Sequence, residues 1–293
     1  MLNRVFSILG AQWLIHQDTA IAYLPVLMAF MKGQDFLLKQ VDDKLPNIAA
    51  KSQPAQSVSL VGKYDLTDPS IPDNSVALLA IDGPLLSWQS IELMNQLRRV
   101  QANDQINSIV LMVNSPGGMV TGLDLLCSTI KTLGKPSVAL VTGMAASAAM
   151  WIISSTSYRI ATSKIDMIGS IGTKTSIQDY SGLLEKIGIK ITDFYASKAT
   201  RKDEQSRAFK ENQDTQPMME IVDFINEVFH QAIIENLGIS PDSEALTGAV
   251  FFAEKALNLG LINEITSVDA AIEKAYQLGL KNKIIVSSKS LNF

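Results

Sequence analysis

One serine stands among small residues in the run 143–151, directly after an apolar segment typical of a buried strand. Ser147 has two alanines before it and two after it. Small neighbours leave room for a substrate beside the hydroxyl, and the start of a helix favours a developing negative charge. The same pattern is also typical of a serine that only caps a helix. The run therefore makes Ser147 a candidate nucleophile, with capping as the alternative.

A second segment that could take part in catalysis, residues 114–120, lies where another predicted strand ends and a helix begins. It contains the adjacent glycines Gly117 and Gly118. Glycines let the backbone approach a ligand closely, and a strand-to-helix turn offers unpaired N–H groups to a negative oxygen. A plain Pro-Gly turn has the same composition. If both turns follow neighbouring parallel strands, however, one supplies oxyanion donors and the other supplies the attacking hydroxyl.

The elements that must position these turns are short apolar runs alternating with segments of helical spacing. Because buried strands of four to six residues separated by helices form βα units, the pattern predicts an α/β fold with a mainly parallel sheet covered on both faces. Predicted strands cover residues 76–81, 109–113, 138–141 and 158–161, and a further short run follows at residues 261–265. Predicted helices cover 91–100, 120–133, a segment from about 145, 204–237, 245–260 and a last helix to about 279.

The chain divides into three predicted regions. Residues 1–74 form an N-terminal region, with one or two helices up to about residue 40 and then a polar linker rich in Pro, Ser and Lys. Residues 75–270 form the main domain. Residues 271–293 contain the end of the last helix and a loose polar tail from about 281.

The bulk properties exclude several classes of function. The chain has 293 residues, a formal net charge of −4, and one cysteine, Cys127, within an apolar run. A mildly acidic chain is not expected to bind nucleic acid, and the absence of a long uninterrupted apolar run predicts no membrane span. Cys127 is expected to be a buried apolar residue, and no His or Cys cluster has metal-ligand spacing. We therefore expect a cytoplasmic protein without metal or cofactor.

Four segments together resemble a known group of proteins over about residues 75–268. Residues 114–118 with 145–147 resemble the superfamily of Clp protease and signal peptide peptidase A. Residues 169–172 are similar to the Gly-Ser-Ile-Gly segment of the signal peptide peptidase branch, and residues 248–262 are similar to its C-terminal segment. Within this branch the chain most resembles the phage and prophage members that act as capsid maturation proteases.

The resemblance implies a Clp/crotonase-like fold of repeated β-β-α units with a helical N-terminal extension. It implies a serine endopeptidase in which Ser147 attacks a peptide carbonyl, while the backbone N–H groups of Gly118 and Ala148, beside Gly117, hold the oxyanion. The substrates would be polypeptides, among them capsid or scaffold proteins. The protein would form a closed homo-oligomer in the host cytoplasm or the phage procapsid.

A serine nucleophile needs a base. The Clp protease uses a histidine shortly after its serine, but here His230 is the only histidine after Ser147, and we interpret it as structural. The resemblance to the signal peptide peptidases instead implies a lysine. It favours Lys202, which precedes an aspartate, with Lys198 as the second candidate, and it gives Ser170 the role of orienting that lysine.

Other interpretations remain open at the level of sequence. The chain could be a signal-peptide-degrading peptidase, a crotonase-type acyl-CoA enzyme, or a capsid assembly or scaffolding partner without activity. Residues 218–229 contain eight apolar side chains in twelve positions, which is more than one helix stripe. We expect that helix to be buried on more than one side, either at a subunit interface or beneath residues 1–40.

Overall fold

The computed structural model describes residues 13–15, 60–61, 65–177, 181–186, 188, 190 and 192–290 of the chain. The strands are β1 (Trp13–Ile15), β2 (Leu60–Val61), β3 (Ser75–Asp82), β4 (Ile106–Ser115), β5 (Gly117–Met119), β6 (Ser137–Ala146), β7 (Tyr158–Ala161), β8 (Met167–Gly169), β9 (Val250–Phe252) and β10 (Glu264–Ile265). The helices are α4 (Ser87–Ala102), α5 (Leu123–Thr132), α6 (Ala148–Ser154), α7 (Ser181–Lys186), α8 (Glu204–Asn212), α9 (Gln216–Leu237), the 3₁₀ helix η2 (Glu244–Thr247), α10 (Ala253–Asn258) and α11 (Val268–Ser290).

The main sheet has the order β10-β7-β6-β4-β3-β2, and these neighbours are parallel. The ten-residue strand β6 has two partners on the same side, β7 along its first half and β8 along its second half. β8 in turn pairs antiparallel with β9. The α/β class, the mainly parallel sheet and the Clp/crotonase-like character of the fold are thereby confirmed.

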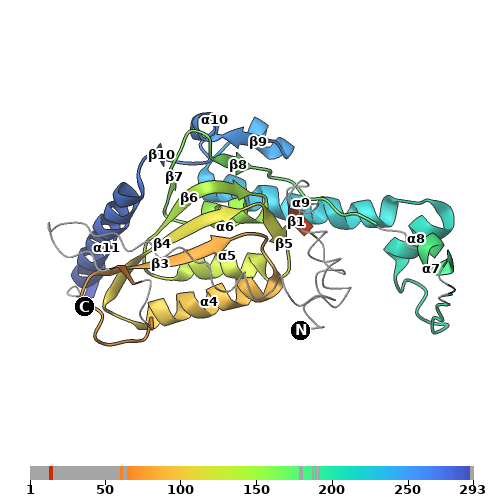
Figure 1. Cartoon of the computed structure of the whole chain (residues 1–293), viewed down its shortest axis with the longest axis horizontal. Coiled ribbons are helices and arrows are strands. Elements are labelled where there is room, and N and C mark those ends of the chain that lie inside the picture. Colours follow the sequence, from red (N-terminus) through yellow and green to blue (C-terminus); the bar gives the residue numbers. More distant parts are fainter. Residues whose placement is uncertain are drawn as a thin grey trace.

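Both faces of the sheet are covered, as the sequence predicts. Alternate residues of β4 point to opposite faces, so Ile109 and Leu111 belong to the large core that includes α4, α5 and α6, whereas Val110 packs with Ala271 and Ala275 of α11. In Figure 1, α11 lies apart from α4 and α5, on another side of the sheet. The central stretches of β4 and β6, residues 109–113 and 138–141, are entirely apolar because both faces of the sheet are covered there.

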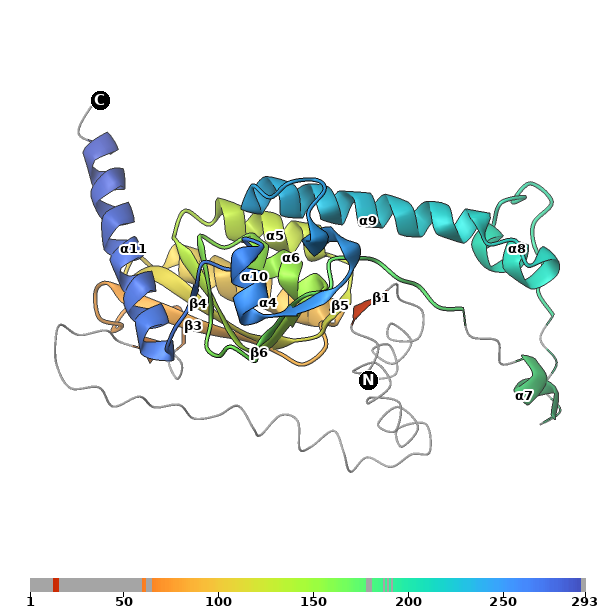
Figure 2. The ribbon, with the colours of Figure 1, turned by 90° about the horizontal axis from the view of Figure 1, so that it is seen from above.

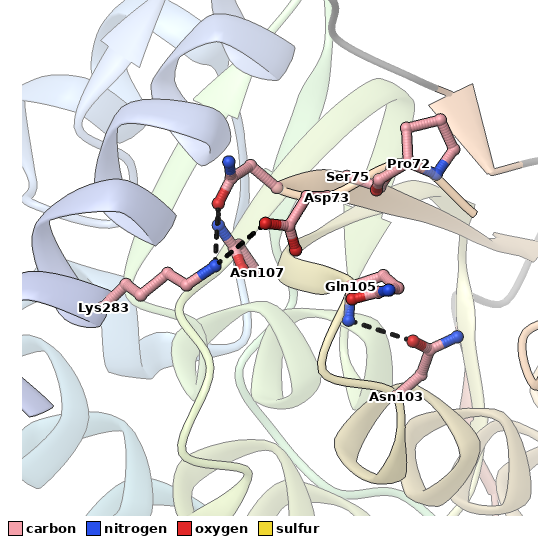
Figure 3. Close-up of polar contacts among 8 residues, drawn as sticks. Pro72, Asp73, Ser75, Asn103, Gln105, Asn107 and Lys283 are labelled. Carbon is pink, nitrogen blue, oxygen red and sulfur yellow. Dashed lines mark hydrogen bonds and ion pairs between the residues drawn. The ribbon is translucent and has the colours of Figure 1, made fainter. Parts of the chain in front are cut away.

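Polar contacts at the start of β3 attach α11 to the sheet (Figure 3). Lys283 of α11 donates to Asn74 Oδ1 at 3.2 Å and forms an ion pair with Asp73 at 3.7 Å. The same helix brings Gly279 against β4, where a Cβ atom on Gly279 would lie 2.9 Å from the Cβ of Asn107. The lack of a side chain at Gly279 therefore allows α11 to pack closely against β4.

One prediction for this helix is wrong. The sequence predicted a last helix to about residue 279 and a loose polar tail from about residue 281. The structure instead continues α11 to Ser290.

The predicted helix over 204–237 is also interrupted. α8 ends at Asn212, Gln213 adopts a positive φ of 56°, and α9 begins at Gln216 with Pro217 in its first turn. Proline suits the first turn of a helix but cannot continue one from the preceding residues, since it lacks the N–H.

The N-terminal region differs from prediction where the structure describes it. Residues 13–15, expected within a helix, form β1, which pairs antiparallel with β5. Leu60 and Val61, expected in a linker, form β2 at the edge of the main sheet. The remaining predicted helical positions up to residue 40 lie outside the described residues.

α9 extends from the core well beyond the sheet, and α8 and α7 lie toward its far end (Figures 1 and 2). The prediction that this helix is buried on more than one side, at a subunit interface or beneath residues 1–40, stays a prediction, since the described structure is a single chain and contains only residues 13–15 of that region. Only Phe229 and Ile233 of α9 are buried, whereas Met219, Phe224 and Val228 are exposed. Among the described residues, no helix has the length and apolarity to span a membrane.

We expect Phe229→Ala to destabilise the fold by about 3–5 kcal/mol, because large-to-small changes in a core leave a cavity. Phe229 is 0% exposed and stacks on Trp151 of α6, with ring centroids 4.9 Å apart. Ile91→Ala, which removes a 55% exposed apolar side chain from α4, is the control and should change stability by less than about 0.5 kcal/mol. Urea unfolding of both variants measures the difference, and equal destabilisation would contradict the packing of α9 on α6.

Candidate active site

Ser147 occupies a strained turn between β6 and α6. Its φ of 56° and ψ of −120° lie outside the usual regions for a residue with a side chain, a strain that concentrates at functional sites. Its N–H donates to the carbonyl of Gly169 at 2.8 Å, which fixes the turn. The Ser147 side chain makes no capping hydrogen bond to α6. The capping alternative is therefore not the role that the structure gives this hydroxyl.

Ser147 lines a cavity of about 410 Å³, although the residue as a whole is only 2% exposed. The cavity walls come from the turn at Ser147, the segment after β8, α9, and the end of η2 with Gly248 directly after it. The other described lining residues are Ser170, Ile171, Gly172, Thr173, Lys174, Met219, Val222, Asp223, Asn226, Leu246, Thr247 and Gly248. The volume is that of a small-molecule or side-chain site.

Ser170 lies in the same cavity and also has a positive φ, 53°. Its N–H donates to the carbonyl of Ala249 at 2.7 Å. The residue before it, Gly169, must be a glycine, because a Cβ there would lie 2.7 Å from the carbonyl oxygen of Ala249. The segments 169–172 and 248–253, far apart in sequence, are thus packed against each other beside Ser147.

The glycine-rich segment lies next to the serine turn, as the sequence predicts. β4 and β6 are paired with Ser115 opposite Ala145, and β5 follows directly. A Cβ on Gly118 would lie 1.9 Å from the carbonyl oxygen of Leu85, so glycine is required there. Ala148 is fully buried at the first position of α6.

The two lysines favoured by the sequence are not brought to Ser147 within this chain. Lys198 and Lys202 lie in an exposed segment before α8, and neither is among the described residues that line the cavity. Figures 1 and 2 both show α8 beyond the sheet, toward the distal end of α9. Next to Lys202, Arg201 forms an ion pair with Glu204 at 2.6 Å.

A different lysine, Lys174, lines the cavity with Ser147 and Ser170. No motif in the sequence distinguished Lys174, because its place in the cavity depends on contacts between distant segments. The segment that carries it is attached to α9, because the Thr173 N–H donates to Asn226 Oδ1 at 3.0 Å. The hydroxyl of Thr173 is buried and has no hydrogen-bond partner.

Two other residues have structural roles, as interpreted from sequence. His230 Nε2 lies 3.4 Å from the carbonyl oxygen of Ile171, and His230 is not among the described lining residues of the cavity. Cys127 is buried, and burial raises the pKa of its thiol to about 12, so the thiol stays protonated and unreactive at neutral pH.

The chain is similar in sequence to several known proteins. The chain is 32% identical over 181 residues to the head-tail preconnector protein GP5 of Enterobacteria phage P21, and 29% identical over 196 residues to a protein of Methanocaldococcus jannaschii named as a protease. It is 26% identical over 216 residues to the capsid assembly protease C of Escherichia phage lambda. The match to the P21 protein covers 60% of this chain and 35% of the relative, and the match to the M. jannaschii protein covers 63% and 60%. The match to the lambda protein covers 68% of this chain and 48% of the relative.

The model of peptidase family S49 matches residues 129–281, just over half of the chain. This range includes Ser147 and Ser170, the cavity they share, and the segments 169–172 and 248–253 that pack beside them. The chain belongs to peptidase family S49.

Proposed function

We propose that this protein is a serine endopeptidase with Ser147 as nucleophile. The observation that carries the proposal is the strained turn at Ser147, which brings a hydroxyl not used for capping into a cavity with Ser170, beside the glycine segment β5. Membership of a peptidase family favours this reaction over acyl-CoA chemistry and over assembly without catalysis.

The proposed reaction proceeds through an acyl-enzyme. Ser147 Oγ attacks the carbonyl carbon of a peptide bond and gives its proton to a neutral lysine. The N–H groups of Gly118 and Ala148 stabilise the oxyanion, and Gly117 permits the close backbone approach. Each such donor is worth about 10²–10³ in rate. The lysine then protonates the leaving amine, and water hydrolyses the ester in the same manner.

We assign the base to Lys202, supplied by a neighbouring copy of the chain. In the single chain Lys202 is exposed and lies outside the Ser147 cavity. The projecting helix α9 carries exposed apolar side chains, including Phe224 and Val228, which an interface between copies would cover. Ser170, which already lies in the cavity, would orient the incoming lysine.

Lys174 is the competing base, because it lines the same cavity as Ser147 within one chain. A dyad of Ser147 and Lys174 would need no second copy. A base from a neighbouring copy predicts that mixtures of inactive variants regain activity, whereas a base within the same chain predicts that they do not. Mixing inactive variants therefore distinguishes Lys202 from Lys174.

For the biological role we propose proteolysis during assembly of phage heads, with capsid or scaffold proteins as substrates. Two relatives support it by name, one as a capsid assembly protease and one as a head-tail preconnector protein. Degradation of signal peptides is the alternative. Portal and major capsid genes adjacent to this gene would support the head-assembly role, and purified capsid protein that is never cleaved would contradict it.

Ser147→Ala should lower peptidase activity by a factor on the order of 10⁶, because it removes the nucleophile. Stability should change by less than about 0.5 kcal/mol, since the hydroxyl makes no capping bond. Ser154→Ala is the matched control in α6, where the hydroxyl donates to the carbonyl of Trp151 at 2.7 Å, and this variant should keep its activity. Labelling by a fluorophosphonate and hydrolysis of casein measure the activity of both variants. Normal turnover by Ser147→Ala would refute the proposal.

Lys202→Ala should lower activity by about 10²–10⁴, the usual contribution of a general base. Lys198→Ala and Lys174→Ala are the matched controls and should remain active. Loss of activity in Lys174→Ala alone would transfer the role to Lys174.

Co-expressed Ser147→Ala and Lys202→Ala chains should recover up to about a quarter of wild-type activity. In random closed assemblies, that fraction of sites would combine an intact serine with an intact lysine of the neighbour. Each variant alone remains inactive. If Ser147 and its base belonged to the same chain, the mixture would stay as inactive as its components.

Active protein should be a homo-oligomer whose dissociation removes activity. Phe224→Asp, on the exposed surface of α9, should shift the assembly toward monomer without unfolding it, because a charge is costly in an apolar interface. Light scattering combined with the casein assay tests this. A monomer with full activity would contradict the need for a second copy.

A further inference from the structure

The strand β5, which contains Gly117 and Gly118, is already paired on both sides. Leu85 forms a parallel bridge to Gly118, with the Leu85 N–H donating to the Gly117 carbonyl and the Met119 N–H donating to the Leu85 carbonyl, each at 2.8 Å. β1 then pairs antiparallel with β5, with Leu14 opposite Gly118. β1 and β5 together make a two-stranded sheet of their own, separate from the main sheet.

This pairing matters because an extended polypeptide binds a protein most simply by adding a strand to a free edge. β5 contains Gly118, to which we assign an oxyanion donor, and it follows Ser115, which is paired beside the serine turn. A substrate that reaches Ser147 as an extended strand would run along β5. With β1 in place, the described structure offers that substrate no open edge on β5.

We propose that Trp13–Ile15 is a built-in competitor of the substrate, which must leave β5 before a polypeptide can be cleaved. The inference rests on the proposed peptidase function and adds a mode of regulation to it. Tryptophan and isoleucine favour strands, so the segment suits the strand pairing that it makes. A competitor in the same chain acts at an effective concentration in the millimolar range, which excludes weakly binding substrates.

The register identifies one pair of positions at which this strand can be locked by a disulfide. Trp13 is opposite Met119, and directly opposite residues of antiparallel strands lie within the Cα separation that a disulfide requires. The other two pairs involve glycines that tolerate no side chain. A Cβ on Gly118 would collide with Leu85, and Gly117 has a φ of 97°. The native Cys127 is buried, so it will not compete in the exchange.

The experiment uses the full chain carrying Trp13→Cys and Met119→Cys. We expect the oxidised protein to hydrolyse casein at least about tenfold more slowly than the same protein after reduction, because the disulfide holds β1 on β5 and reduction allows β1 to leave. The two single variants, oxidised in the same way, are the controls and should show no change on reduction. Equal rates in both redox states, or failure of the pair to form a disulfide, would overturn the inference.

Fluorophosphonate labelling separates this failure from failure of the proposed function. Labelling of Ser147 in the reduced protein, with equal casein hydrolysis in both states, would leave the peptidase standing without the competitor strand. No labelling in either state, with the wild type also unlabelled, would refute the peptidase and the inference together.

A second variant keeps the inference testable if the change at the buried Met119 disturbs folding. Leu14→Pro, in the middle of β1, removes a backbone donor and weakens strand pairing without any change in β5. Casein hydrolysis by this full-length variant should exceed that of the wild type, by about tenfold if β1 leaves β5 in one wild-type molecule in ten. A rate no higher than that of the wild type would count against the competitor strand.

Discussion

The parallel pairing of β4 with β6 is the interaction on which the candidate site depends. It places Ser115 opposite Ala145, so the segment 115–119 and the turn at Ser147 emerge at the same end of the sheet. Neither turn is reactive alone. Because the pairing is parallel and both strands are buried, their carboxyl ends meet at one edge, where ligands bind in open α/β sheets. A shift of one residue in this register would turn the side chains of one strand to the opposite face.

A second layer of packing completes the cavity. β8 continues the pairing of β6 beyond β7 and receives β9 on its other side, which brings Ser170 and Gly248 to the serine turn. α9 closes the remaining wall. Its buried half is fixed by the stacking of Phe229 on Trp151, and Asn226 accepts a hydrogen bond from the backbone of Thr173. The strain at Ser147 and Ser170 is maintained by these neighbours, since positive φ values persist only where the surroundings enforce them.

The other half of α9 has a different character. It leaves the core with Phe224 and Val228 exposed and carries α8 far from the serine turn (Figure 2). In a monomer this arrangement is a liability, because apolar side chains meet water and the favoured lysine lies away from its serine. In the closed assembly that we propose, one contact between copies would cover the exposed apolar side chains of α9 and would also place Lys202 of one copy beside Ser147 of the next.

The sequence by itself determined the class of fold, its buried strands and the adjacency of the two turns, because apolar runs and strand-to-helix turns are local patterns. It also pointed to Ser147 and Ser170 through motifs, although a motif cannot show whether a serine caps a helix. Only the tertiary structure decided that Ser147 is strained and does not cap, and that Lys174 shares its cavity. The structure also decided that α11 continues beyond residue 279, with Gly279 packed against Asn107. The three residues of β1 carry too short a pattern to reveal a partner about a hundred positions away. In each of these cases the outcome depends on contacts between segments that are distant in sequence, and local periodicity carries no information about such contacts.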